Sequence, residues 1–369
     1  MRNVLWILTL LLVSGCASVG NVTSFSNATD TEHLQRNERR LWQEAANIDQ
    51  TFDRSGQIYR NKRATSYVQG IMDKLYPEFK GKIHVHLYDS TRLNAFALPN
   101  GSVYVNIGLL AHIENEAQIA AVLGHEATHF IEKHSLKERV HTKNAAAFAL
   151  SGIPFSRLAA TSSISGFSRA EEREADAKGY KRLVRAGYDP REAPKVFQHL
   201  ADEVDALGIK EPYFFSSHPK LVDRINGFKR MSRGHKGGGR IGSRRYNRIM
   251  SSIRLDVLRK DIGQDRFKSV ILVMEDNNMK RYFPAASYFY LGEAYNRRDN
   301  KGDKVRALKA YRTAQKLAPR FAPSYMRLGM HYMKEGNKSK ARHYLRRYLR
   351  LAPKDAPDRP YIQQYLKSL

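Results

Sequence analysis

The stretch AAVLGHEATHFIEKH, residues 120–134, constrains the fold and the chemistry of the chain more than any other. It places His125 and His129 four residues apart, with Glu126 directly after the first histidine. Helical positions i and i+4 lie on one face, so both imidazoles can reach one metal ion and Glu126 can accept a proton from water beside it. Two surface histidines on an ordinary helix would show the same spacing, but the apolar residues before the motif indicate a buried helix.

A catalytic zinc site needs a third protein ligand and keeps its fourth position open. The stretch FSRAEEREADAKGY, residues 167–180, predicts a second helix that carries Glu172 and Asp176 four residues apart. Its small residues would let this helix pack closely on the first. Glu172 could bind the metal, and Asp176 could accept a hydrogen bond from a histidine. Spacing alone does not distinguish Glu172 from Glu171 or Glu174, which have the pattern of a solvated charged face.

The first twenty residues, MRNVLWILTLLLVSGCASVG, have the layout of a secretory signal. An arginine precedes an apolar run that is too short to span a bilayer, and small and polar residues follow. The residues up to Cys16 resemble a bacterial lipobox. We therefore expect a signal peptide at 1–15, a lipid on Cys16 and a tether at 16–30, with Ala17 favouring the outer membrane. The alternative is a plain signal peptide with an incidental cysteine.

The chain is strongly basic. It contains 63 Lys and Arg against 36 Asp and Glu, a net charge of +27. Residues 280–369 alone contain 22 basic and 6 acidic residues, a net charge of +16. Such a surplus favours an anionic partner or environment. Because the predicted export argues against nucleic acid, the charge should either meet anionic lipid or form a solvated surface.

The segment between the two candidate domains is distinctive. Residues 231–245 are basic and glycine-rich without apolar periodicity, which predicts an interdomain linker. Beyond it, Tyr-x2-Leu-Gly-x2-Tyr occurs at 288–295 and again at 325–332, within copies of the tetratricopeptide template of about 34 residues. Two copies are fewer than a stable solenoid needs, so 246–279 and the C-terminal end should add capping helices. We expect an all-α domain at 246–369.

The order of motifs over residues 35–230 resembles the zinc metallopeptidase family that includes the CAAX prenyl endopeptidases, the HtpX heat-shock protease and the BepA-like periplasmic proteases. A strand segment NAFALPNGSVYVNIGLL, the histidine helix, the carboxylate helix and a late segment SSHPKLVDRI occur in the family's order. The tetratricopeptide tail is most similar to the BepA-like branch. The resemblance implies a gluzincin-type α+β domain at 31–230, mostly helical with a small sheet, followed by the tetratricopeptide-like helical domain.

The same resemblance implies one zinc ion per chain, bound by His125, His129 and Glu172. Glu126 would be the general base, and Asp176 would hold a histidine in place.

Two further candidates lie in the late segment. His218 could bind zinc at rest and keep the site latent, or stabilise the oxyanion during turnover. A histidine that only begins a helix before Pro219 is an equal alternative. Arg224 could pair with a carboxylate or with the oxyanion. His134, five residues past His129, lies off the ligand face and is interpreted as structural.

These expectations together imply a zinc endopeptidase at the periplasmic face of the outer membrane. It would cleave unfolded or stalled envelope proteins in outer-membrane protein quality control, with the repeats contacting clients or assembly machinery. Substrate would add a strand to an edge strand expected at 101–107, and residues 145–166 could form a lid or an ordinary connection. The alternative is a tetratricopeptide chaperone or adaptor for outer-membrane assembly with a latent or secondary protease activity.

Overall fold

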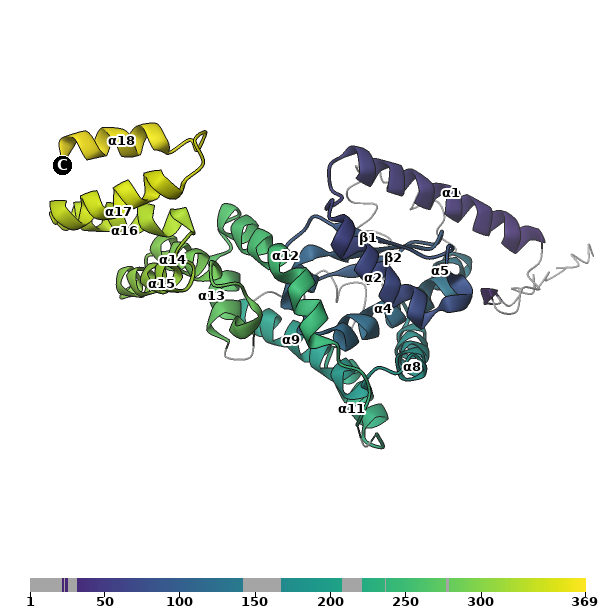
Figure 1. Cartoon of the computed structure of the whole chain (residues 1–369). Coiled ribbons are helices and arrows are strands. Elements are labelled where there is room, and N and C mark those ends of the chain that lie inside the picture. The colour runs from purple at the N-terminus through teal and green to yellow at the C-terminus, as the bar shows by residue number, and fades with distance from the viewer. Residues whose placement is uncertain are drawn as a thin grey trace, which may run out of the picture.

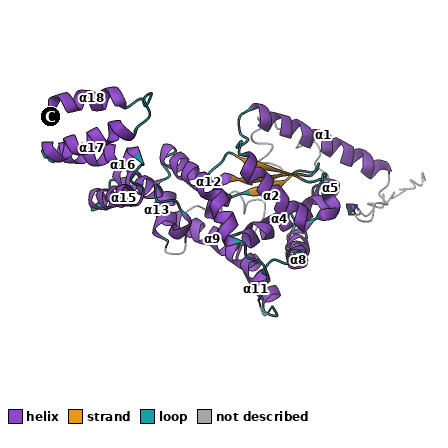
Figure 2. Cartoon of the chain, in the orientation of Figure 1, coloured by secondary structure: helices purple, strands orange, loops and turns teal. Residues whose placement is uncertain are grey.

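The computed structural model describes residues 22, 24–25, 32–141, 167–207, 221–235, 237–276 and 279–369. In this part of the chain, a helical body surrounds a small sheet, and paired helices extend from that body to the C-terminus (Figures 1 and 2). This confirms the predicted α+β domain followed by helical repeats. The predictions for the signal peptide, Cys16, residues 145–166 and His218 fall outside the described residues.

The elements, in chain order, are α1 (Glu32–Arg54), α2 (Lys62–Leu75), η2 (Pro77–Phe79), β1 (His84–Tyr88), β2 (Ala95–Ala97), β3 (Ser102–Asn106), α3 (Ile107–His112), α4 (Glu116–Ile131), α5 (His134–His141), α8 (Arg169–Arg185), η3 (Pro190–Glu192), α9 (Ala193–Leu207), α11 (Leu221–Ser232), α12 (Ser243–Gly263), α13 (Phe267–Glu275), η4 (Lys280–Tyr282), α14 (Ser287–Arg298), α15 (Asp303–Leu317), α16 (Ala322–Lys334), α17 (Lys338–Leu351) and α18 (Arg359–Ser368). Among the described helices, none combines the length and the apolar character needed to cross a bilayer.

The three strands form one sheet in the order β1-β3-β2. β3 pairs in parallel with β1 and antiparallel with β2, so its backbone is hydrogen-bonded on both sides. The prediction that residues 101–107 form an open edge strand is therefore wrong, because β2 occupies that edge. The predicted turn at Asn100-Gly101 joins β2 to β3. Gly101 has φ +92°, a conformation that L side chains rarely adopt.

The sheet lies between two helical layers (Figure 1). On one face, Phe52 of α1 packs edge-on against Tyr104 of β3, with ring centroids 5.0 Å apart. On the other face, Val103 and Val105 join the main core together with α2 and α4. The strand alternation therefore divides the side chains of β3 between two cores.

Helix α4 is buried along its whole length, as the apolar sequence before the histidine motif predicts. Asn115 begins it, because its side-chain oxygen accepts a hydrogen bond from the backbone N–H of Gln118 at 3.0 Å. The side-chain amides of both residues also donate to the carboxylate of Glu192. These bonds fix the start of α4 before its functional residues are reached.

Helices α4 and α8 cross at two glycines. A Cβ atom added at Gly179 would lie 2.8 Å from the carbonyl carbon of Gly124 and from the backbone nitrogen of His125. The two backbones can approach this closely only because neither carries a side chain at the crossing. Glu172 lies two turns before Gly179 on α8, so the crossing brings its carboxylate to the histidines of α4.

The predicted linker at 231–245 is not free between two domains. Residues 237–242, here called the strap, pack on the first body, where Arg240 forms a parallel bridge to Tyr188. A Cβ atom at Gly239 would lie 2.4 Å from a backbone nitrogen of that body. The glycines of the strap therefore permit close contact between backbones.

Helix α12 belongs to two cores. Its residues from Tyr246 to Val257 pack in the core of the first body, whereas Leu258 and Ile262 pack in the core of the repeats. Between them, the fully buried Arg254 donates to two carbonyl oxygens at the end of α3 and to one in η4. One guanidinium thus joins the two parts of the chain.

The repeats form helix pairs, α14 with α15 and α16 with α17, which confirms the predicted pattern. Gly292 and Gly329 occupy equivalent positions in the two copies. A Cβ atom at Gly292 would lie 2.4 Å from the Tyr311 ring, and one at Gly329 would lie 2.5 Å from the side chain of Leu345. In each repeat, a large side chain of the second helix therefore packs against the glycine of the first helix.

We predict that Gly179→Ala lowers the free energy of unfolding by about 1–3 kcal/mol, because the added methyl group forces α8 away from α4. Gly70→Ala is the matched control, since Gly70 is an exposed residue of helix α2 with no atom within 4 Å of the added Cβ. The control should be neutral or stabilising by up to about 1 kcal/mol. Urea unfolding of both variants measures the difference. Equal stability of the two variants would contradict a tight crossing.

Candidate metal centre

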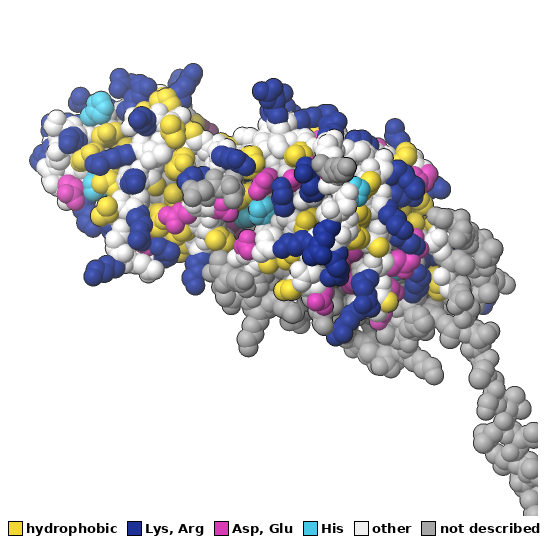
Figure 3. All heavy atoms as spheres, turned by 90° about the horizontal axis from the view of Figure 1, so that it is seen from below, with side chains coloured by type: hydrophobic (Ala, Val, Ile, Leu, Met, Phe, Trp, Pro, Cys, Tyr) yellow, Lys and Arg dark blue, Asp and Glu magenta, His cyan; other side chains and the backbone are white. Residues whose placement is uncertain are grey.

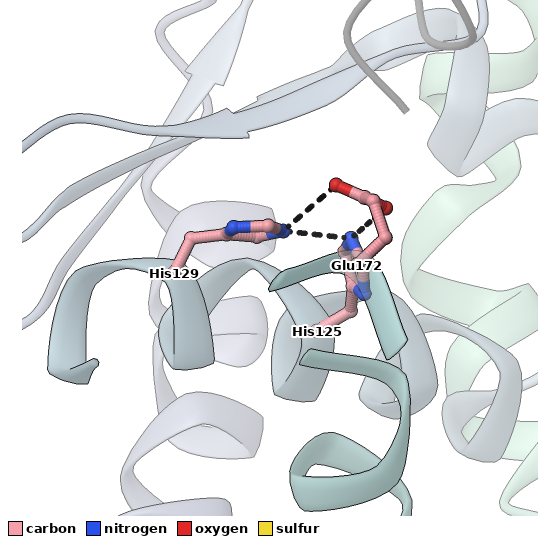
Figure 4. Close-up of side chains that lie close together, drawn as sticks. All are labelled: His125, His129 and Glu172. Carbon is pink, nitrogen blue, oxygen red and sulfur yellow. Dashed lines mark hydrogen bonds and ion pairs between the residues drawn. The ribbon is translucent and has the colours of Figure 1, made fainter. Parts of the chain in front are cut away.

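Two histidines of α4 and one glutamate of α8 converge on a single point (Figure 4). His125 Nε2 lies 3.0 Å from His129 Nε2. The Glu172 carboxylate places Oε2 3.5 Å from the first nitrogen and Oε1 3.4 Å from the second. All three side chains are buried, with exposed fractions of 1%, 2% and 4%.

These separations fit a zinc ion. Bonds of about 2.0–2.1 Å in a tetrahedral site place neighbouring ligand atoms roughly 3.3 Å apart. Two imidazole nitrogens and one carboxylate oxygen also form a donor set that catalytic zinc sites use, with the fourth position left for water or substrate. The residues present can therefore hold the zinc that the sequence predicts.

Asp176 holds the imidazole of His125 in place. Its Oδ1 lies 2.9 Å from His125 Nδ1. Burial would raise the pKa of Asp176, but Arg224 and the hydrogen bond with His125 hold it well below its usual range. Burial and the charge of Arg224 lower the pKa of His125 to about 4, so this imidazole is neutral at neutral pH. A neutral His125 that donates from Nδ1 presents Nε2 to the metal.

Arg224 of α11 pairs with two buried carboxylates. Its Nη2 donates to Asp176 Oδ1 at 2.7 Å, its Nε donates to Oδ2 at 3.1 Å, and its Nη1 lies 3.7 Å from Glu172 Oε2. Burial would lower the pKa of Arg224, but Asp176 and Glu172 raise it. Of the two partners that the sequence allowed for Arg224, the structure shows the carboxylate.

His134 holds the imidazole of His129 in place, as Asp176 holds that of His125. The two Nδ1 atoms lie 2.9 Å apart, and His134 Nε2 lies 3.2 Å from Glu174 Oε2. His129 can donate to His134 and His134 to Glu174, which leaves His129 Nε2 facing the metal. No pattern in the sequence predicts this contact. The turn at Lys133, with φ +53°, brings His134 back to His129, and helical periodicity does not predict such a turn.

The neighbouring glutamates have other partners, which resolves the ambiguity of the second helix. Glu171 forms a capping box with Ser168, because each side chain accepts a hydrogen bond from the backbone N–H of the other residue. Glu174 contacts His134. Glu171 is therefore not part of the solvated face that the sequence suggests, whereas Glu174 is partly exposed and also pairs with Lys137 and Lys178. The helix register leaves Glu172 directed at the histidines.

Glu126 follows His125 on α4, and its side chain is 1% exposed. Its negative charge contributes to the raised pKa of Arg224, which lies against Asp176 and Glu172. Glu126 thus lies on the same buried helix as the two histidines, and its role as general base remains a prediction. His218 lies outside the described residues, and its two roles remain predictions.

We predict a graded loss of zinc affinity across α8. Glu172→Ala should lose the metal, because two histidines are too few to hold zinc firmly. Glu174→Ala should weaken binding by roughly 10- to 100-fold, since His134 would no longer be fixed against His129. A fully solvated Glu174, as the pattern of the sequence suggests, would leave the zinc affinity unchanged.

Competition with a chromophoric chelator measures the affinities, and the exposed Glu335→Ala serves as a control that should match the unaltered chain. A larger loss for Glu174→Ala than for Glu172→Ala would show that the ligand assignment is wrong.

Two segments of the chain match known families. Residues 59–232 match peptidase family M48, and residues 322–355 match the tetratricopeptide repeat. The three candidate ligands lie in the first segment, and helices α16 and α17 lie in the second.

Curated relatives match the same part of the chain. A putative beta-barrel assembly-enhancing protease of Vibrio cholerae is 32% identical over 159 residues, which cover 38% of this chain and 33% of that protein. The beta-barrel assembly-enhancing protease of Escherichia coli K12 is 26% identical over 192 residues, covering 46% and 39%. The mitochondrial metalloendopeptidase OMA1 of Arabidopsis thaliana is 36% identical over 165 residues, covering 42% and 31%. The matched region thus spans between 31% and 39% of these relatives. This chain therefore carries a metalloprotease domain of peptidase family M48, joined to a tetratricopeptide region.

Proposed function

We propose that the chain is a zinc-dependent endopeptidase that cleaves unfolded or stalled proteins of the cell envelope. The observation that carries this proposal is the convergence of His125, His129 and Glu172 next to the buried Glu126. Zinc held there would polarise a peptide carbonyl and make a water molecule more acidic.

The chain's own residues supply the proton transfers and the positioning. Glu126 accepts a proton from the attacking water and returns it to the leaving amine. Asp176 and His134 hold the imidazoles of His125 and His129, so that both Nε2 atoms face the same point. Because these contacts are formed before substrate arrives, the histidines need not reorganise during the reaction.

Extended segments of unfolded proteins are the proposed substrates. The three candidate ligands are buried, and a cavity of about 400 Å³ borders Glu172, Asp176 and Arg224, so an extended segment would reach them more easily than the surface of a folded domain would. A role in outer-membrane protein quality control is supported by two relatives that are named beta-barrel assembly-enhancing proteases. The location that fits this role is the periplasmic face of the outer membrane, with a lipid anchor on Cys16.

A second candidate function is a chaperone or adaptor for outer-membrane assembly, with proteolysis latent or secondary. Helices α14 to α17 extend away from the metal centre and offer a surface that the site does not use (Figure 1). Unfolded clients or the assembly machinery would bind there.

We predict that Glu126→Gln binds zinc with unchanged affinity and cleaves casein on the order of 10²- to 10⁴-fold more slowly, because the general base is lost. Single-turnover proteolysis and a zinc determination on the same preparation test this. Wild-type activity in the variant would contradict the assigned role. A variant that is inactive but still supports outer-membrane assembly in cells would favour the adaptor function.

We also predict that Cys16→Ser moves the protein from the membrane to the soluble fraction, because acyl chains are the proposed anchor. Fractionation of cells, with mass spectrometry of the mature N-terminus, measures the change. If the variant is processed normally and stays in the membrane, the lipid anchor is not what holds the chain there.

A further inference from the structure

A basic cavity lies where the first turns of α2 and α12 meet the strap. Its volume is about 840 Å³, and none of the candidate metal ligands lines it. Among the described residues at its wall there are five arginines and no carboxylate: Arg63, Arg240, Arg244, Arg245 and Arg248. The hydroxyl groups of Ser66 and Ser243 lie at the same wall.

The nearest buried carboxylate is already fully engaged. Arg240 Nε lies 3.0 Å from Glu116 Oε1. The hydroxyl groups of Tyr67 and Tyr188 also donate to this carboxylate, at 2.5 and 2.9 Å. The guanidinium of Arg245 lies over the Tyr67 ring, 5.1 Å from its centroid. Glu116 therefore neutralises Arg240, and among the described residues no carboxylate pairs with the other arginines of the cavity.

The remaining arginines occupy positions that are unfavourable for cations. Arg244, Arg245 and Arg248 lie in the first two turns of the 21-residue helix α12, where the helix dipole is positive. Arg244 and Arg248 are four residues apart, so their like charges repel on one face. In the part of the chain that the structure describes, Arg63, Arg244 and Arg248 have no ion-pair partner.

The first turn of α12 adds donors to the same cavity. It contains no acidic residue, and no side chain caps it. Its N-terminal N–H groups lack partners within the helix by the geometry of any α-helix. An anion in the cavity would accept hydrogen bonds from these N–H groups and would also reduce the repulsion among the arginines. Both the N–H groups that lack partners within the helix and the clustered positive charge of α12 would then be compensated.

We propose that this cavity binds the phosphate group of a phosphorylated ligand, as a phosphomonoester or a diphosphate. A guanidinium donates two parallel hydrogen bonds to phosphate oxygens, and arginine is suited to this contact more than lysine is. The volume lies in the range of small-molecule sites, so there is room for more than a bare ion. A lipid headgroup and a soluble phosphorylated molecule present the same chemistry.

The test compares the full-length chain with two double variants. Arg244→Gln with Arg248→Gln removes two charges from the cavity. Arg346→Gln with Arg350→Gln removes two charges at the same spacing from exposed positions on α17. All of these are exposed side chains, and thermal unfolding checks that both variants fold. Inorganic phosphate is titrated by calorimetry, and flotation measures binding to phosphatidylcholine vesicles with and without phosphatidic acid.

We expect saturable binding that the cavity variant weakens by on the order of tenfold for each arginine, whereas the α17 variant matches the unaltered chain. Loss of free phosphate binding identifies a soluble ligand. If the cavity variant loses binding only to the vesicles that contain phosphatidic acid, the ligand is a lipid headgroup. Equal weakening by both double variants would assign binding to diffuse charge and overturn the proposal, as would no binding of either probe by the unaltered chain.

Discussion

The close crossing of α4 and α8 at Gly124 and Gly179 is the constraint on which the metal centre depends. Packed helices are ordinarily held apart by the side chains between them. Here the backbones meet directly, because a Cβ atom on either glycine would be closer than normal contact. The carboxylate of Glu172 can then lie within 3.5 Å of both histidines, although it comes from a different helix. The capping box at Ser168 fixes where α8 begins and so which carboxylate faces α4.

The polar contacts around the ligands explain how so much charge can be buried. Removing charged groups from water is expensive unless each one has a partner. Asp176 has Arg224 and His125, and Glu174 has His134 and Lys178. Each chain of contacts ends on the Nδ1 atom of one ligand histidine. The same partners that compensate the buried charge therefore also choose which nitrogen faces the metal.

The basic side chains of the chain have more than one role. Lys and Arg side chains outnumber acidic ones on the face shown in Figure 3, over both the first body and the repeats. Several arginines nevertheless hold the fold together. Arg254 joins α12 to α3 and η4, and Arg240 holds the strap on Glu116. The surplus is thus partly structural, partly solvated, and in one place concentrated around a cavity.

The sequence by itself determined the helices and the residues that could do chemistry. Spacing of four residues places His125 and His129 on one face whatever surrounds them, because helical periodicity is a local property. The glycine and tyrosine pattern of the repeats is local in the same sense. Family resemblance then selected Glu172, which spacing left equivalent to its neighbours.

Only the tertiary structure decided what lies opposite each residue. His134 reaches His129 through a turn, and β3 lies inside the sheet because β2 pairs with its far side. The glycines of the strap could equally have formed a flexible linker. Glycine permits both close contact and free movement, and the choice depends on which backbone packs against it. That partner comes from a distant part of the chain, so a local pattern could not reveal it.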